Sequence, residues 1–189
     1  LQSRHPADNP IRQLHLSCGD IHGFSADGFS ATAANKRGWN ATASFRVEDF
    51  AGHPVVRNAQ RGPIDEDAWS RMQAGRTTIS HQLPSGRFFA TLAGFAEKRG
   101  NGTHLGRNQA DGFDWALGLR KEKTSSILFG QERDFSSIFP TVTGVKAERA
   151  SERIALDQYS VPASSLGFVH ENSIDADEHE FGFTAMILR

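Results

Sequence analysis

The stretch WNATASFRV, residues Trp39–Val47, decides the fold class. Its odd-numbered positions are apolar from end to end, and its even-numbered positions between them are polar. Successive side chains of a β-strand point to opposite faces, so a period of two residues predicts a half-buried strand.

The same alternation recurs along most of the chain. Turn signals separate several of these segments, namely Pro84-Ser85-Gly86 and the Asn101-Gly102 pair that is typical of hairpins. We therefore predict a mostly β protein, folded as a single-domain sandwich or as a barrel-like sheet. The further predicted strands are Ile11–Ser17, Arg76–Leu83, Arg87–Ala96, Phe113–Leu119, Ser126–Phe129 and Phe181–Ile187.

One short helix is predicted at about residues 63–74. Pro63 suits the first helical position, and Ile64, Ala68 and Met72 fall four residues apart on one stripe. Gly75 follows, where a left-handed cap would end the helix.

The alternating apolar positions also predict the core. Each lies within a predicted strand, on the side that we expect to be covered. These residues are Trp39, Phe45, Val47, Phe88, Leu92, Trp115, Leu117, Phe181, Phe183 and Ile187.

Length and composition indicate one domain. The chain has 189 residues, which suits a single core. Residues 1–10 contain two prolines and no periodicity, and we interpret them as a flexible N-terminal arm ahead of one β-rich domain at residues 11–189. Residues 145–158 fit either a helix or a strand.

The charge pattern argues against binding to nucleic acid. The net charge is −1, with 21 basic and 22 acidic residues well mixed and no basic block. No apolar run is long enough for a membrane-spanning helix, and we see no apolar side common to the predicted strands that would face lipid. We therefore expect a soluble protein; its compartment stays open.

The most suggestive chemical motif is Gly19-Asp20-Ile21-His22-Gly23. It resembles the first metal-binding block of the calcineurin-like metallophosphoesterases. The resemblance implies that Asp20 and His22 bind a divalent metal, which activates water against a phosphate. It covers only these few residues, and the family's second Gly-Asp-x-x-Asp block is absent. The structural alternative is a glycine-flanked turn with polar side chains.

Other catalytic signatures are missing. The chain contains no Gly-x-Ser-x-Gly motif, no P-loop and no strand-linked Gly-x-Gly-x-x-Gly motif. Asp175, Asp177, Glu178, His179 and Glu180 are typical of a solvated acidic loop.

Two functional hypotheses remain. The preferred one is a non-enzymatic structural or binding β domain that needs no cofactor and assembles with copies of itself, as a building block of a viral, phage or secretion assembly does. Ser126–Phe129 and Phe181–Leu188 contain neither Pro nor Lys to blunt a sheet edge, which favours a homo-oligomer. The alternative is a metal-dependent phosphoesterase-like hydrolase that uses Asp20 and His22.

Overall fold

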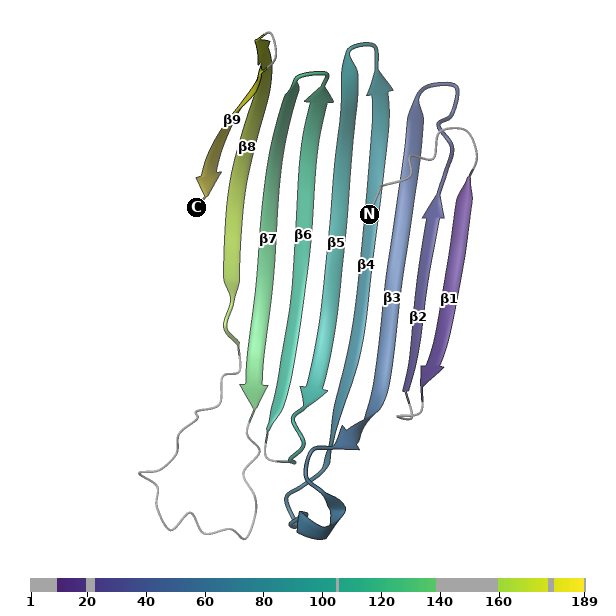
Figure 1. Cartoon of the computed structure of the whole chain (residues 1–189), viewed down its shortest axis with the longest axis vertical. Coiled ribbons are helices and arrows are strands. Elements are labelled where there is room, and N and C mark those ends of the chain that lie inside the picture. The colour runs from purple at the N-terminus through teal and green to yellow at the C-terminus, as the bar shows by residue number, and fades with distance from the viewer. Residues whose placement is uncertain (1–9, 20–22, 105, 139–159, 177–178, 189) are drawn as a thin grey trace.

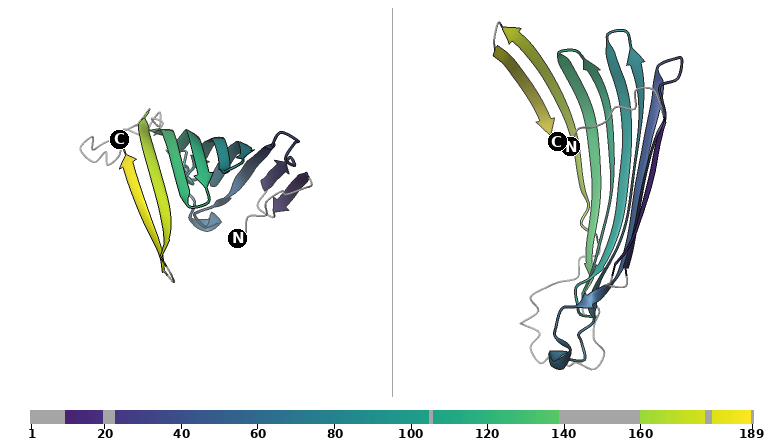
Figure 2. Two further views of the ribbon diagram at one scale, coloured as in Figure 1. Left: turned by 90° about the horizontal axis from the view of Figure 1, so that it is seen from above. Right: turned by 45° about the vertical axis from the view of Figure 1, so that its right-hand side comes forward.

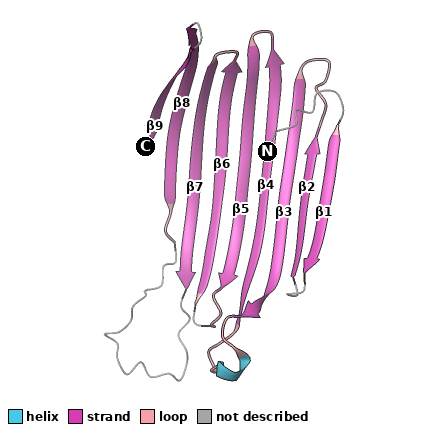
Figure 3. Ribbon diagram, viewed as in Figure 1, coloured by secondary structure: helices cyan, strands magenta, loops and turns pink. Residues whose placement is uncertain are grey.

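A computed structural model shows a chain that consists almost entirely of β-strands (Figure 3). The structure describes residues 10–19, 23–104, 106–138, 160–176 and 179–188. The strands are β1 (Ile11–Gly19), β2 (Gly23–Ala31), β3 (Trp39–Pro54), β4 (Asp67–Leu83), β5 (Gly86–Gly100), β6 (Arg107–Lys121), β7 (Thr124–Ile138), β8 (Ala163–Ala176) and β9 (His179–Leu188). The mostly β prediction is confirmed.

All nine strands form one antiparallel sheet, in which each strand pairs with its neighbours along the chain (Figure 1). The order runs from β1 to β9, and these two strands are the edges. Figure 2 shows a single curved layer. Of the two predicted architectures, the two-layered sandwich is wrong for the described strands, and the sheet is curved as in a barrel-like sheet but is not closed.

The predicted helix at residues 63–74 is also wrong. The helical element in the described part of the chain is a 3-10 turn at Asn58–Gln60. Residues from Asp67 onward form β4, which pairs with β3 on one side and β5 on the other. Gly75, expected as a helix cap, lies inside β4. Pairing with two neighbouring strands stabilises this segment more than a local helical spacing of three apolar residues could, because tertiary pairing overrides local propensity.

Seven of the nine strands were predicted in the right places, most of them too short, and β2 and β8 were not predicted. β4 has 17 residues, and β5, β6 and β7 have 15 each. Pro84-Ser85 forms a tight connection between β4 and β5, as predicted. Gly102 has a φ of 86° in the connection after β5, which fits the turn signal there.

The predicted core is the largest discrepancy. Ala31 is the one buried apolar residue among those that the structure describes. Trp115 is half-buried, and the side chains of Phe181, Phe183 and Ile187 lie outside the described part. The other predicted core residues are exposed, namely Trp39, Phe45, Val47, Phe88, Leu92 and Leu117. A single layer provides nothing to cover them.

Two further predictions fall on residues outside the described ranges. These are the arm, apart from the exposed Pro10, and the segment 145–158.

Candidate functional site

The predicted metal residues Asp20 and His22 lie in the segment 20–22, which the structure does not describe. The segment joins β1 to β2, two antiparallel strands of one hairpin. Across the described residues, no group of three or more His, Cys, Asp or Glu side chains is placed to hold a metal ion. The metal site stays a prediction.

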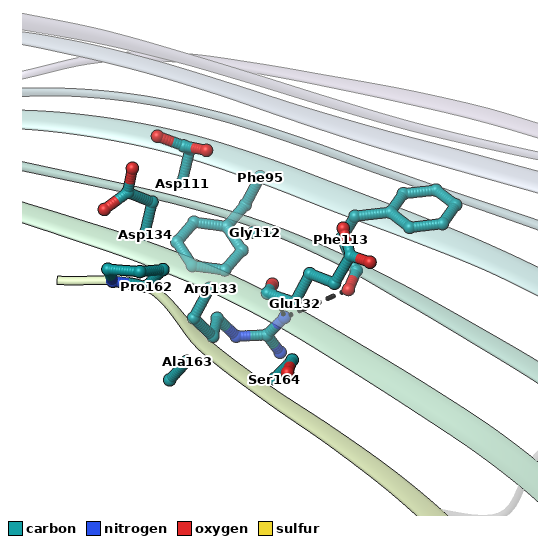
Figure 4. A pocket seen from close by; sticks show the side chains of 10 residues that line it. All are labelled: Phe95, Asp111, Gly112, Phe113, Glu132, Arg133, Asp134, Pro162, Ala163 and Ser164. Carbon is teal, nitrogen blue, oxygen red and sulfur yellow. Dashed lines mark hydrogen bonds between the residues drawn. The ribbon is translucent and has the colours of Figure 1, made fainter. Parts of the chain in front are cut away.

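A pocket of about 530 Å³ lies where β6, β7 and the start of β8 meet (Figure 4). Its central side chain is Arg133, which is fixed by contacts within the sheet. The guanidinium Nη2 lies 2.6 Å from Oδ1 of Asp114, Nη1 donates to the Glu132 carbonyl at 2.7 Å, and the group lies 5.3 Å from the Phe95 ring centroid. Ser164 is the only hydroxyl or thiol nucleophile in the lining, and no histidine accompanies it. This pocket therefore lacks a nucleophile with a base beside it.

The two faces of the sheet differ strongly in the kind of side chain that they expose. The register places side chains level across the strands, because directly paired residues share a face. One such row, on what we call the apolar face, consists of Ala43, Thr77, Leu92, Trp115, Gly130 and Leu166. The next row, on what we call the polar face, consists of Ser44, Arg76, Ala93, Asp114, Gln131 and Ser165.

Nearly all the exposed large apolar side chains of β1 to β8 lie on the apolar face; Phe29 and Phe135 are the exceptions. The sequence prediction that the strands share no apolar side is wrong. The residues are Leu14, Leu16, Phe24, Trp39, Phe45, Val47, Ile79, Phe88, Leu92, Phe113, Leu117, Leu119, Leu128, Leu166 and Phe168.

The polar face is the more covered of the two. Its buried side chains are Ala31, Ser80, Thr91 and Ser137, three of them polar. Ser137 donates to Oδ1 of Asn108 at 2.9 Å, and the hydroxyls of Thr78 and Thr91 lie 2.9 Å apart. Side chains on the inner, concave side of a curved sheet lie closer together and are therefore less exposed. We infer that the polar face is the inner side.

Charges on the polar face are largely paired. Arg46 pairs with Glu48, and Arg99 donates to both carboxylate oxygens of Glu97 at 2.6 and 2.8 Å. This hydrogen bonding, with the attraction of the guanidinium, holds the pKa of Glu97 below its ordinary value; desolvation opposes the shift. The same contacts raise the pKa of Arg99.

The apolar face ends at a charged border, toward the end of β3 and the beginning of β4. Asp49, Arg71 and Lys98 lie level on β3, β4 and β5. Arg71 Nε lies 3.2 Å from Oδ2 of Asp49. One row further up the sheet, Asp111 and Asp134 lie opposite each other on β6 and β7.

The upper limit of the apolar face is a row that contains Trp39, His81, Phe88 and Leu119. The Trp39 and His81 rings stack with centroids 4.4 Å apart and planes at 22°. Between the two borders, apolar side chains predominate in a band across this face, and charged side chains interrupt it at Arg12 on β1 and Glu132 on β7.

Searches against family models, curated proteins and solved structures find no match to the chain. No helix that the structure describes is both long enough and apolar enough to cross a membrane. The site is therefore defined by geometry alone, and its principal feature is the apolar face.

Sequence reasoning identified the members of this face but not their exposure. The alternation in Trp39–Val47 grouped the apolar residues correctly onto one side. The prediction assumed a second layer that would cover these residues. The predicted helix is not present, and no other segment of the described chain covers the sheet.

Proposed function

We propose that this chain is a non-enzymatic structural β-sheet whose apolar face lies against lipid hydrocarbon and whose polar face lies against water. The observation that carries the proposal is the inverted burial: large apolar side chains such as Leu92 are open, while Ser80 and Thr91 on the other face are buried. Proteins in water place these classes the other way round.

The free energy at stake requires a partner for this face. Covering one large apolar side chain is worth roughly 1.5–3 kcal/mol, and the band contains many of them on seven or more strands. Continuous exposed apolar patches above about 300–600 Å² are rare on proteins in water and mark a site of contact.

The dimensions of the band favour lipid. On β3 the band runs from Trp39 to Val47, which is nine residues and about 30 Å along the strand at roughly 3.3 Å per residue. The hydrocarbon layer of a bilayer is about 30 Å thick, and it is less than this along the normal for a tilted strand. A charged border closes the band at one end and a stacked Trp-His pair at the other, as two water interfaces require.

Shape disfavours a second copy as the cover. If the apolar face is the outer side of a curved sheet, two copies touch only along a narrow strip when placed face to face. Lipid chains are fluid and follow the curve. In addition, each interior strand pairs on both sides, as hydrocarbon demands of backbone polar groups.

Assembly with copies of itself is the second part of the proposal, through the edges of the sheet and not through its face. β1 is unpaired on one side and its nine residues include neither Pro nor Lys. An unpaired strand edge is costly in hydrocarbon, so a neighbouring strand would stabilise it.

Flotation with neutral phosphatidylcholine vesicles tests the lipid contact. The full chain is expected to float with the vesicles. Leu92→Glu places a charge in the middle of the apolar band, and its partition into the vesicles should fall by roughly tenfold or more, because a carboxylate in hydrocarbon costs on the order of 2 kcal/mol or more.

Gln131→Glu is the matched control. It adds the same charge at nearly the same level, but on the polar face, where the side chain is exposed. It should float like the parent. Equal flotation of the two variants, or a parent that stays with the aqueous fraction, would overturn the lipid contact.

A further inference from the structure

Two arginines lie directly opposite each other on the polar face, at the end of the sheet where β4 turns into β5 and β6 turns into β7 (Figure 1). They are Arg87 at the start of β5 and Arg120 near the end of β6. Directly paired residues have Cβ atoms about 4.5–5.5 Å apart, and like charges in this arrangement repel. The pair therefore destabilises the sheet unless an anion lies beside the two guanidinium groups.

Neither arginine has an acid partner among the described residues, unlike most other charges of the polar face. Arg133 lies 2.6 Å from Asp114, and Arg99 donates to Glu97. In contrast, the Nε atom of Arg87 is buried and has no hydrogen-bond acceptor within the described part of the chain. A buried donor without an acceptor costs free energy. This atom therefore points to an acceptor from outside the described residues.

A hydroxyl group on the next strand has the same property. Ser125 on β7 is directly opposite Arg120, so Arg87, Arg120 and Ser125 form one row across three neighbouring strands. The Oγ atom of Ser125 is buried and has no hydrogen-bond partner among the residues that the structure describes. We call these three residues the arginine site. Two polar atoms without partners thus lie on either side of one exposed guanidinium group.

An aromatic ring helps to hold Arg120 in this position. The guanidinium carbon lies 5.7 Å from the centroid of the Phe89 ring, which attracts a cation over its face. The ring accepts no conventional hydrogen bond, so the guanidinium N–H groups stay available to an oxygen acceptor. Phe89 and the half-buried Ile127 belong to the next row toward the middle of the sheet. Apolar neighbours strengthen the attraction between the site and an anion.

The charges in the row of the arginine site have a positive excess. Gln82 lies opposite Arg87 on β4 and adds no charge. Glu171 lies opposite Ser125 on β8, two strands from Arg120, and it limits the site on that side. The connection between β6 and β7 adds one charge of each sign. An anion is therefore favoured between Gln82 and Ser125.

We propose that the arginine site binds the phosphate group of a water-soluble molecule, either inorganic phosphate or a phosphate monoester. Guanidinium groups bind phosphate oxygens in a bidentate manner, and the serine hydroxyl adds a further donor. Because Arg120 is exposed, one side of the site is open to the rest of an ester. The site lies on the face that meets water in the proposed function, but it follows from the strand register alone.

Equilibrium dialysis of radiolabelled phosphate against the full chain in maltoside micelles tests the site. Maltoside has no phosphate group, so the detergent does not compete. We expect the parent to bind phosphate saturably. Arg87→Gln/Arg120→Gln should weaken the binding by roughly tenfold or more, because it removes charge-assisted hydrogen bonds. This variant also removes a repulsion, so it should keep the β signal in circular dichroism.

Two further variants separate the site from the general charge of the chain. Ser125→Ala should weaken phosphate binding several-fold, because it removes one hydrogen-bond donor and no charge. Arg57→Gln/Arg107→Gln is the matched control, since it removes two exposed arginines near the opposite end of the sheet. The control should bind phosphate like the parent.

The proposal is overturned if the parent does not bind phosphate saturably, if the arginine-site variant keeps the parent's affinity, or if the control loses as much. Displacement of phosphate by chloride at matched ionic strength would also overturn it, because a diffuse positive field would then explain the binding. A parent that fails to float with neutral vesicles contradicts only the proposed lipid contact, so the two failures are distinct.

Glycerol 3-phosphate distinguishes the two sources of the phosphate group. If it displaces inorganic phosphate at an equal or lower concentration, the site takes phosphate monoesters. If it does not, the site is assigned to inorganic phosphate. Both results require the same loss in Arg87→Gln/Arg120→Gln.

Discussion

At the scale of single residues, several aromatic rings occupy the space beside glycines on the neighbouring strand. Phe89 on β5 is directly opposite Gly118 on β6, and a Cβ atom on that glycine would overlap the ring. The Trp115 ring covers Gly130 in the same way. In a sheet without a second layer, these contacts between neighbouring strands replace much of the packing that a core provides.

Gly118→Ala should therefore destabilise the sheet by about 1–3 kcal/mol, because the added methyl group forces the Phe89 ring from its place. The measurement is the free energy of unfolding by urea in detergent micelles. Gly75→Ala is the matched control: it also lies in a strand interior, but the nearest atom to its added Cβ is the Ser44 carbonyl oxygen at 3.8 Å. The control should be neutral within about 0.5 kcal/mol; equal losses would remove the special role of the ring contact.

At the scale of elements, the strands extend beyond the alternating segments that predicted them. Apolar and polar residues alternate only in the part of a strand where one face meets apolar surroundings and the other face meets water. The ends of β4 and β5, which include Arg71 and Lys98, have water-seeking side chains on both faces. Their ladder hydrogen bonds continue without the pattern, so the sequence prediction begins β4 too late and ends β5 too early.

The predicted helix failed for a related reason. A period of four in Ile64, Ala68 and Met72 is a local signal. It contains no information about the ladders with β3 and β5, in which Ala68 pairs with β3 and Met72 pairs with both strands. Only pairing with distant residues decides between the two structures.

The three tryptophans test how far the apolar band reaches along the strands. Trp115 lies in the middle of the band, whereas Trp69 lies on the same face beyond Arg71, past the charged border. In vesicles with brominated acyl chains, a chain with only Trp115 should be quenched strongly. A chain with only Trp69 should be quenched weakly, because its ring lies outside the hydrocarbon.

The variants are Trp39→Phe/Trp69→Phe and Trp39→Phe/Trp115→Phe, each read by steady-state fluorescence. Both keep an aromatic ring at every changed position, so the face keeps its apolar character. Similar quenching in the two chains would show that the charged border does not mark the edge of the hydrocarbon.

At the scale of the molecule, a single layer with neighbour-only pairing explains why sequence reasoning reached the class but not the architecture. Local patterns decide which residues form strands and which side chains share a face. Whether that face meets another sheet or lipid depends on what lies outside the strands themselves. The core prediction assumed a second layer, and Leu92 and Leu117 are exposed because none is present among the described elements.

The sequence expectation for the sheet edges is confirmed for Phe181–Leu188, which lies in the edge strand β9, but is wrong for the other segment. Ser126–Phe129, expected at an edge, lies inside β7 and pairs with both β6 and β8. The edges are β1 and β9. The expected assembly must therefore use these two strands, and β1 is the one whose side chains the structure describes.

Light scattering in detergent, with the detergent mass subtracted, tests assembly through β1. We expect a protein mass of at least twice the 20.7 kDa of one chain.

Proline removes a backbone donor, and along an edge strand the N–H groups alternate between the paired neighbour and the open side. Of Gln13→Pro and Leu14→Pro, one therefore removes a donor that faces the open edge and leaves the β2 ladder intact. That variant should give a single-chain mass with an unchanged β signal in circular dichroism, while the other should lose part of the β1–β2 pairing. A parent of single-chain mass at all concentrations, or an assembly that survives both prolines, would show that β1 does not join copies of the chain.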